Sequence, residues 1–348
     1  METRIVDMTE GMRQPELDEA GKILRRGGLV AFPTETVYGL GADALNEEAS
    51  ARIYAAKGRP SDNPLIVHIA RLEDLEGITC DVPEAAKKLA KAFWPGPLTM
   101  ILKKNDRVPE GTTGGLKTVA VRMPDHALAR ALILAGGGYI AAPSANTSGR
   151  PSPTTANHVR EDLAGKIDMI LDGGPVEIGL ESTIVDLSEE QPVILRPGYI
   201  SRQMLESVVG PVGVDGALLS ADSNVRPKAP GMKYRHYAPR ASLIIVEGPR
   251  QKVVEEICRL AGQGTREGEK IGIIAAEETA GAYRDGIVKT VGSREDELSI
   301  ARHLYGILRE FDEIEVTRIY SEAFDTPKMG QAIMNRLMKA AGHQMMKV

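Results

Sequence analysis

The sequence contains few cysteines and few aromatic residues. Only Cys80 and Cys258 are present among 348 residues. Neither has a cysteine or histidine at metal-ligand spacing, so no protein-bound metal site is predicted. Aromatic residues make up 4% of the chain, too few for an extended platform on which successive nucleic-acid bases stack. Composition therefore predicts neither a zinc module nor a base-stacking protein.

The chain also lacks long apolar runs and a strongly basic segment. No run approaches the roughly 20 apolar residues that span a bilayer, and the charged start METRIVDMTEGMRQPE has no signal-peptide core. We therefore expect a cytoplasmic protein without membrane association. Residues 1–200 hold 22 Lys and Arg against 28 Asp and Glu, a balance of −6, and residues 201–348 have a balance of +1. Stable nucleic-acid binding through phosphate neutralisation is not expected.

Several common catalytic motifs are missing. No G-x-x-x-x-G-K-[ST] phosphate loop occurs, because Gly21-Lys22 and Gly165-Lys166 are each followed by isoleucine. Neither G-x-S-x-G nor H-E-x-x-H is present. The tripeptide Gly262-Gln263-Gly264 follows an expected helix and precedes an expected strand, which is the wrong context for a dinucleotide fingerprint. A Ser-His-Asp triad is not local in sequence and stays open.

Short apolar strands alternate with amphipathic helices, which predicts an α/β fold. Several strands are continuous apolar runs, typical of a sheet covered on both faces. The expected strands cover residues 29–32, 65–69, 98–102, 119–121, 139–142, 169–171, 183–186 and 193–195, and the expected helices residues 16–26, 47–57 and 202–208.

The texture of the sequence changes after residue 209. Residues 210–232 are rich in Gly, Pro, Ala and Ser, which is typical of a linker. The following alternation predicts a second, smaller α/β domain with a parallel sheet. Its expected strands are 243–246, 271–275 and 315–320, and its helices 251–260, 295–310 and 331–341. We therefore divide the chain into a domain at 1–209, a linker at 210–240 and a domain at 241–348.

Polar loops follow the apolar strands, at the places where α/β sheets usually bind ligands. PTETVYGLGADA, residues 33–44, offers the hydrogen-bonding groups of Thr34, Glu35, Thr36 and Tyr38 and two glycines, although on this segment alone a simple strand-to-helix turn is the better explanation. KGRPSDNPLIVHI, residues 57–69, gathers Lys57, Arg59, Ser61 and Asn63 on a loop expected to be exposed. Arginine grips phosphate with two nitrogens and lysine acts as a point charge. Alternatively, Lys57 complements a helix dipole and Arg59 is a solvated charge.

Three further loops carry similar groups. APSANTSGRPSPT, residues 142–154, places hydroxyls and an amide beside Arg150, although ordinary loops have this composition too. ESTIVDL, residues 181–187, and RPGYI, residues 196–200, are weak signals alone. His68 lies in an apolar strand, where a hydrogen-bonded, half-buried histidine is the default.

Together these segments resemble a known family. PTETVYGLGADA, KGRPSDNPLIVHI, FWPGPLT, SANTSGRPSPT, ESTIVDL and RPG occur in the order seen in L-threonylcarbamoyladenylate synthases. PGMKYRHYAP resembles the interdomain linker of that family and AIMNRLMKAA its C-terminal helix. The resemblance covers nearly the whole chain. It implies a YrdC-like twisted mixed sheet with flanking helices, followed by a smaller Rossmann-like α/β domain.

The resemblance also implies a reaction. L-Threonine, bicarbonate or CO2, and ATP with Mg2+ give L-threonylcarbamoyladenylate and pyrophosphate. The product would serve a downstream tRNA threonylcarbamoyl transferase. Such a reaction needs positioning and charge compensation rather than a protein nucleophile, which agrees with the missing nucleophile motifs.

Site residues follow from the same resemblance. Lys57 and Arg59 are the expected catalytic cations. The reaction also needs a cation for the threonine carboxylate, and Arg122, at the end of the expected strand 119–121, is expected to supply it. The expected ATP contacts are Lys57, Arg59, Asn63, Thr118, Ser144, Asn146, Ser152, Arg196 and Tyr237. The expected threonine contacts are Thr36, His68, Arg122, Ala142 and Ser182. Tyr234 and Tyr237 are candidates for a lid that keeps water from the labile adenylate, the alternative being a fixed packing role.

Two alternatives come from other classes. An RNA-binding module is disfavoured by the acidic first 200 residues and the few aromatics. A maturation factor that transfers a carbamoyl group from carbamoyl phosphate on a similar fold would be expected to carry cysteine-rich metal-binding segments, and this chain has two cysteines.

Overall fold

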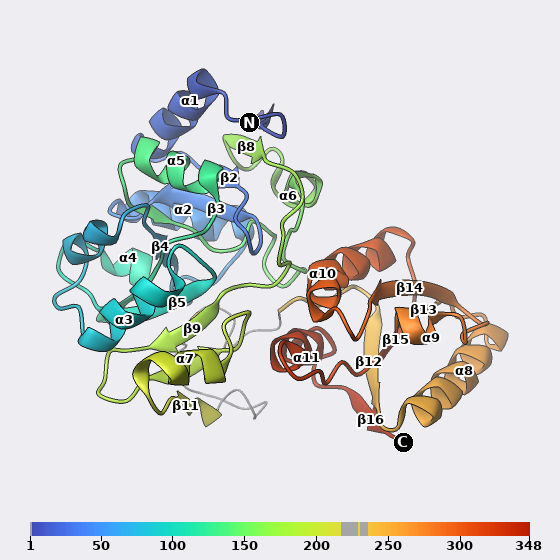
Figure 1. Ribbon diagram of the computed structural model, residues 1–348. Coiled ribbons are helices and arrows are strands. Elements are labelled where there is room, and N and C mark those ends of the chain that lie inside the picture. Colours follow the sequence, from blue (N-terminus) through green and yellow to red (C-terminus); the bar gives the residue numbers. More distant parts are fainter. Residues whose placement is uncertain (1, 217–228, 230–235) are drawn as a thin grey trace. The chain divides into compact units, whose positions relative to one another are not determined.

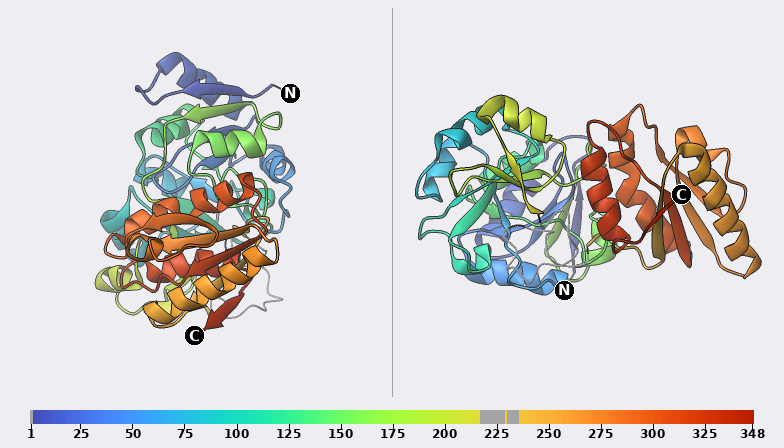
Figure 2. Two further views of the ribbon diagram at one scale, coloured as in Figure 1. Left: turned by 90° about the vertical axis from the view of Figure 1, so that its right-hand side faces the viewer. Right: turned by 90° about the horizontal axis from the view of Figure 1, so that it is seen from below.

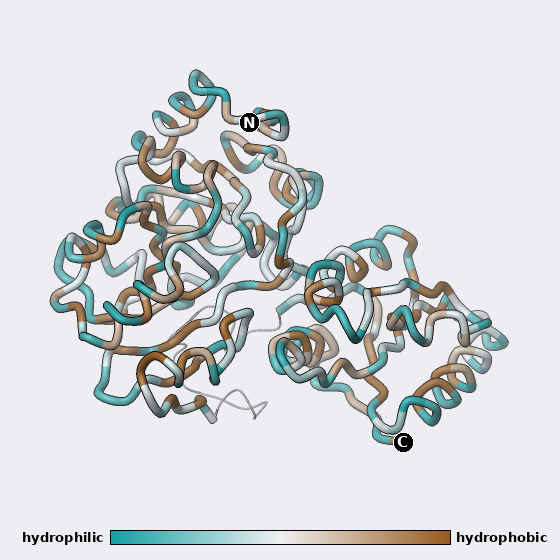
Figure 3. Tube along the Cα trace, in the orientation of Figure 1, coloured by the Kyte–Doolittle hydropathy of each residue, from teal (hydrophilic) through white to brown (hydrophobic). Residues whose placement is uncertain are grey.

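The computed structural model describes residues 2–216, 229 and 236–348, which form two compact units (Figure 1). The first unit consists of the described residues of Met1–Ser148, Ser152–Glu177 and Glu181–Lys233. The second consists of those of Gly149–Pro151, Ile178–Leu180 and Tyr234–Val348. Within each unit, hydrophobic residues concentrate along the strands and hydrophilic residues along the outer loops (Figure 3). No helix in this part of the chain is long and apolar enough to cross a membrane.

The first unit is built on a mixed sheet with the strand order β1-β8-β2-β3-β7-β4-β6-β5-β9-β10-β11. Its strands, in chain order from β1 to β11, are Arg4–Asp7, Val30–Phe32, Gly39–Asp43, Ile66–His68, Leu98–Lys103, Thr118–Arg122, Ile140–Ala141, Met169–Asp172, Thr183–Asp186, Val193–Arg196 and Gly213–Val214. Neighbouring strands are parallel in some pairs, such as β4 with β6, and antiparallel in others, such as β5 with β6. The predicted mixed sheet is confirmed.

Helices flank this sheet. They are α1 (Gln14–Arg25), α2 (Glu47–Lys57), α3 (Glu84–Phe93), α4 (Glu110–Thr113), α5 (Ala127–Ala135), α6 (Ala156–Leu163) and α7 (Arg202–Val209), together with the 3-10 helix η1 (Leu72–Gly77). Helix α2 shows why the local sequence suffices: the Asn46 side chain accepts a hydrogen bond from the Ala49 amide, and Gly58 ends the helix at a φ of 60°. Its predicted bounds are confirmed.

Two local predictions were wrong. The second half of the segment 33–44 is not a loop but strand β3, which pairs with β2 and β7. Glycine has a low strand propensity, but a Cβ on Gly41 would lie 2.9 Å from both the Phe32 and the Ile140 side chains. Close packing therefore requires glycine at position 41, and this glycine is why the sequence did not predict the strand. The tripeptide Gly262-Gln263-Gly264 lies inside helix α8 (Arg250–Arg266) rather than after a helix.

The second unit contains an all-parallel sheet with the order β14-β13-β15-β12-β16, as predicted. The strands β12 to β16 are Ser242–Glu247, Ile271–Ala276, Ile287–Gly292, Arg318–Glu322 and Met345–Lys347. The helices are α8, α9 (Glu277–Ala280), α10 (Glu297–Glu313) and α11 (Gly330–Ala340). Helix α8 covers one face of this sheet, and α10 and α11 cover the other (Figures 1 and 2).

Candidate active site

Lys57 is the last residue of α2, and its side chain is buried rather than exposed. Its ammonium group donates hydrogen bonds to the backbone carbonyls of Ser144 and Asn146. The Ser144 hydroxyl in turn donates to the Asn146 side-chain oxygen. The expectation of an exposed loop was wrong for Lys57, because the chain after β7 folds over the end of α2. The structure brings these three predicted residues together.

Arg59 closes the loop that follows α2. It is half-buried, and its Nη2 donates to the carbonyls of Asn63 at 3.2 Å and Pro64 at 3.0 Å. Asn63 is buried, and its side-chain oxygen accepts no hydrogen bond within the described residues. Ser61 is exposed. The loop thus holds a guanidinium and an amide in fixed positions close to Lys57 in the sequence.

Arg122 ends strand β6, and its side chain is buried, with 5% of its surface exposed. Its Nη2 lies 2.7 Å from Oε1 of Glu35, and its Nη1 donates to the Thr36 hydroxyl at 2.9 Å. Its Nε donates to the Gly96 carbonyl at 3.3 Å. Glu35 was not among the expected site residues, although it directly precedes the expected contact Thr36 in the segment PTET. The pair fixes the Arg122 guanidinium in one orientation.

His68 lies beside Arg122, since the two residues are in register between β4 and β6. Its Nδ1 is 3.1 Å from the Ile66 carbonyl oxygen. Burial, together with the nearby positive charge of Arg122, lowers the pKa of His68 to about 3. The imidazole is therefore neutral at pH 7, and it provides a hydrogen-bonding group rather than a charge.

A second cluster joins Ser182 and Arg196. The Ser182 hydroxyl lies 2.7 Å from the Thr99 hydroxyl, and Arg196 donates to the Ser182 hydroxyl at 3.1 Å and to its carbonyl at 3.0 Å. Thr99 is in register with Arg122 between β5 and β6, so the two lie on the same face of the sheet. Thr99 was not predicted, and its place in the segment FWPGPLT was the available signal. The hydrogen-bonded residues Thr99, Ser182 and Arg196 thus lie beside Arg122 on this face of the sheet.

The remaining predicted residues of the first unit are more scattered. Ser152 is buried and donates to the Glu181 carboxylate at 2.5 Å. Ala142 is buried directly after β7, and its amide donates to the Ile66 carbonyl. Thr118 begins β6 whereas Arg122 ends it. At about 3.3 Å per residue the two Cα atoms are roughly 13 Å apart, so the structure does not bring Thr118 to Arg122.

The predicted linker residues fall partly outside the described residues. Tyr234 lies outside them. Tyr237 is described with the second unit, where its ring stacks on that of Tyr305 with 5.1 Å between the centroids. Tyr237 is buried and has a φ of 65°.

The electrostatics of the first unit suit anions. Lys57, Arg122 and Arg196 are buried cations beside hydroxyl or carbonyl oxygens, and Arg122 is also paired with the Glu35 carboxylate. Buried cations beside hydroxyls bind carboxylate or phosphate strongly, because the low dielectric strengthens the attraction. Within the described residues, no group of three or more His, Cys, Asp or Glu is placed to hold a metal ion.

Comparison with known proteins identifies the family. Residues 22–198 match the Sua5/YciO/YrdC family model, described as "Telomere recombination", and residues 200–342 match the C-terminal domain of threonylcarbamoyl-AMP synthase. The chain is 50% identical to a threonylcarbamoyl-AMP synthase of Bacillus subtilis over 98% of both chains. It is 49% identical to one of Pyrococcus abyssi over 99% of this chain and 100% of the other.

Solved structures agree with this result. The crystal structure of P. abyssi Sua5 complexed with L-threonine matches with a TM-score of 0.95 and 49% identity, over 99% of this chain and 100% of the other. Sheet, helices and sequence define a two-domain protein with a Sua5/YciO/YrdC-like first part. The chain belongs to the threonylcarbamoyl-AMP synthase family. The resemblance and the fold class predicted from the sequence are both confirmed.

Proposed function

We propose that this chain makes L-threonylcarbamoyladenylate and pyrophosphate from L-threonine, bicarbonate and ATP. The observation that carries the proposal is the 50% identity to a relative named threonylcarbamoyl-AMP synthase, which extends over 98% of both chains. Such full-length identity does not favour an RNA-binding module or a carbamoyl-transfer maturation factor. The product would then be used by a tRNA threonylcarbamoyl transferase, and the protein would act in the cytoplasm.

The chemistry requires two bond-forming steps. The threonine amine combines with CO2 derived from bicarbonate to give a carbamate. A carbamate oxygen then attacks the α-phosphorus of ATP, the bond from that phosphorus to the bridging oxygen breaks, and pyrophosphate leaves. Neither step needs a covalent enzyme intermediate, so binding energy is used for alignment and charge compensation.

Threonine would bind among the buried polar residues near Arg122. We assign the carboxylate to Arg122 and the remaining contacts to Thr36, neutral His68, Ser182 and the backbone at Ala142. The ion pair with Glu35 supports this role, since it holds the planar fork of the guanidinium in place before substrate arrives. Preorganisation of this kind lowers the entropic cost of binding.

ATP would bind on the side of Lys57. We assign Lys57 and Arg59 as the catalytic cations that offset the developing negative charge on the phosphates. The further ATP contacts are assigned to Asn63, Thr118, Ser144, Asn146, Ser152 and Arg196. Mg2+ would be held by the phosphate oxygens rather than by a protein site, and it would neutralise part of the triphosphate charge.

The test is a reconstituted reaction. The protein is incubated with ATP, bicarbonate and isotopically labelled L-threonine, and the products are followed by pyrophosphate release and mass spectrometry. The expected result is a labelled adenylate that requires all three substrates. Turnover of carbamoyl phosphate without threonine would instead support the maturation factor. RNA binding that weakens steeply with salt, with no adenylate, would support the RNA-binding module.

A further inference from the structure

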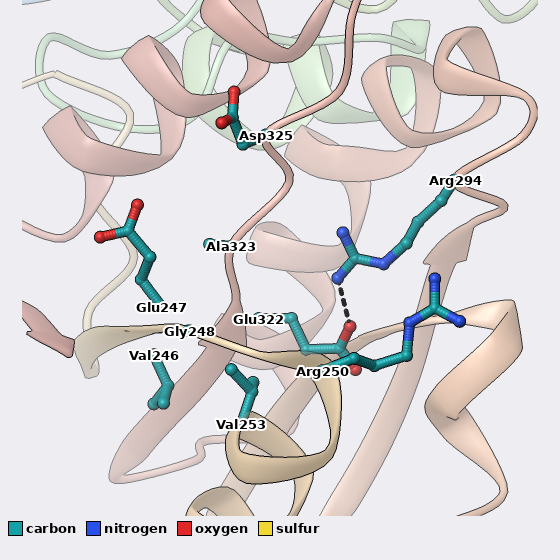
Figure 4. Close-up of a pocket in the computed structure, with 9 residues that line it drawn as sticks. All are labelled: Val246, Glu247, Gly248, Arg250, Val253, Arg294, Glu322, Ala323 and Asp325. Carbon is teal, nitrogen blue, oxygen red and sulfur yellow. Dashed lines mark hydrogen bonds and ion pairs between the residues drawn. The ribbon is translucent and has the colours of Figure 1, made fainter. Parts of the chain in front are cut away.

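The second unit contains a cavity of about 270 Å³ at the carboxyl ends of its parallel strands (Figure 4). Strands β12 and β15 are neighbours, but the chain leaves β12 for α8 on one face of the sheet and leaves β15 for α11 on the other. Such a reversal is where open α/β sheets bind ligands. The cavity is lined by Val246, Glu247, Gly248, Arg250, Val253, Arg294, Glu322, Ala323 and Asp325.

One wall of the cavity is positively charged. Arg294 is held by the buried Glu322, with 2.7 Å between Nη2 and Oε2, and its guanidinium lies 5.1 Å from the centre of the Phe324 ring. The other oxygen of Glu322 accepts hydrogen bonds from the hydroxyls of Thr279 and Tyr283. Glu322 is thus fully used in orienting Arg294. The buried Nε of Arg294 has no acceptor within the described residues.

Arg250 adds an uncompensated charge to the same wall. It begins helix α8, its side chain is exposed, and it forms no ion pair within the described part of the chain. Figure 4 shows the side chains of Arg250 and Arg294 on the same side of the cavity. Because Glu322 pairs with Arg294, the residues that line this wall carry about one net positive charge, which suits a single carboxylate.

The opposite wall is acidic. Glu247 and Asp325 lie across the cavity from the two arginines (Figure 4). Glu247 is 3.4 Å from the exposed Lys347, whereas Asp325 has no ion-pair partner within the described residues. This wall suits an ammonium group. The cavity volume lies just below the range of roughly 300–1,000 Å³ that is typical for drug-sized ligands, which suits a small ligand. The segment EGPRQ at the end of β12 is not a dinucleotide fingerprint, so a dinucleotide is not expected here.

We propose that this cavity binds a small zwitterion, an α-amino acid, with its carboxylate between Arg250 and Arg294 and its ammonium toward Glu247 and Asp325. The site lies wholly within the second unit. It is separate from the residues assigned to threonine and ATP in the first unit, so it holds or fails independently of the proposed reaction.

The test uses the full chain with isotopically labelled valine methyl groups. The NMR signals of Val246 and Val253, which line the cavity, are followed while each standard L-amino acid is added singly. At least one is expected to shift both signals in a saturable way. Its N-acetyl derivative and its methyl ester should each bind at least about tenfold more weakly than the free amino acid, because each lacks one of the two charges.

A matched pair of variants completes the experiment. Arg250→Ala is expected to weaken binding about tenfold or more, whereas Arg284→Ala, which removes an exposed arginine outside the cavity lining, should bind like the unmodified chain. The proposal is overturned if no amino acid shifts the signals or if Arg250→Ala binds normally. It is also overturned if inorganic phosphate or the N-acetyl derivative binds as well as the free amino acid, since the site would then select for an anion alone.

Discussion

At the scale of single residues, the geometry of Arg122 makes a specific demand on its side chain. Its three donor nitrogens contact Glu35, Thr36 and Gly96 at once. Lysine has no planar fork and cannot reproduce these contacts. We expect Arg122→Lys to raise the KM for threonine about tenfold or more, with little change in the KM for ATP.

Steady-state kinetics with each substrate varied in turn measure this effect. Glu35→Gln is a useful companion, because it keeps the shape of the partner but removes its charge. A selective rise in the KM for ATP would show that Arg122 belongs to the nucleotide instead.

Lys57 and Arg59 are expected to differ, although both are assigned to ATP. The buried Lys57 ammonium joins α2 to the carbonyls of Ser144 and Asn146. Lys57→Ala should therefore reduce ATP use and also lower the free energy of unfolding by about 1–3 kcal/mol, since buried carbonyls lose their donor. Arg59→Ala should reduce ATP use with the fold essentially intact.

Urea denaturation and turnover assays on the two variants separate these effects. Equal losses of stability in both variants would contradict the difference in burial. Normal ATP use in either variant would remove that residue from the proposed phosphate site.

His68 gives a pH dependence whose sign follows from burial. Its pKa is about 3 in the folded chain and about 6.5 in an unfolded one. Below pH 6.5 the unfolded state takes up a proton that the folded state does not, so stability falls as the pH drops toward 3. Between pH 7 and pH 5 this contribution is about 2 kcal/mol.

The matched variant is His68→Gln, which cannot titrate. The free energy of unfolding is measured at pH 7 and at pH 5. Its drop between the two should be about 2 kcal/mol smaller in the variant than in the unmodified chain. Identical pH dependence of the two proteins would mean that His68 titrates normally in the folded state.

At the scale of helices and strands, glycine is needed at positions 58 and 41 for different structural reasons. Gly58 has a φ of 60° with no atom within 4 Å of an added Cβ, whereas an added Cβ at Gly41 meets two side chains at 2.9 Å. Gly58→Ala should cost about 1 kcal/mol of stability through backbone strain alone. Gly41→Ala should cost about 1–3 kcal/mol through overpacking.

Denaturant unfolding of both variants measures these costs. A further substitution, Phe32→Leu, is expected to recover part of the loss in Gly41→Ala, because it removes the ring that the new methyl group meets. It should do nothing for Gly58→Ala. If Phe32→Leu restores no stability to Gly41→Ala, the strain in that variant does not come from the contact with Phe32.

Local signals explain which elements could be predicted. Helix α2 was predicted at its observed bounds because acidic residues open it and Gly58 ends it. Strand β3 was missed because its Gly41 is required by contacts with Phe32 and Ile140, which come from two other strands. Sequence periodicity carries no information about such contacts.

The candidate site shows the same limit. Motif order singled out Lys57, and its place at the end of an expected strand singled out Arg122. Neither the Glu35 partner nor the burial of Lys57 was predicted, since both depend on chain segments that meet only in the folded sheet.

At the scale of the whole molecule, the question left open by the sequence is whether the segment at Tyr237 moves when substrates bind. Tyr237 is 5% exposed and stacks on Tyr305, and the amide of the next residue, Ala238, donates to the Gly149 carbonyl at 2.9 Å. The Tyr237 side chain therefore makes its packing contacts without any bound substrate. We therefore expect the Ala238 amide to be protected from hydrogen exchange before ATP and threonine are added, and its protection to be unchanged afterwards.

The same reasoning fixes the expected behaviour of Tyr237→Ala. Loss of a buried, stacked ring should lower the free energy of unfolding by about 3 kcal/mol or more, while Tyr237→Phe, which keeps the ring, should cost much less. The opposite pattern defines a moving lid, because a lid gains its contacts only in the closed state. Protection of Ala238 would then rise when both substrates bind, and Tyr237→Ala would keep its stability but release or hydrolyse the adenylate faster. Exchange measured on peptides that contain residues 236–240, with and without substrates, decides between the two.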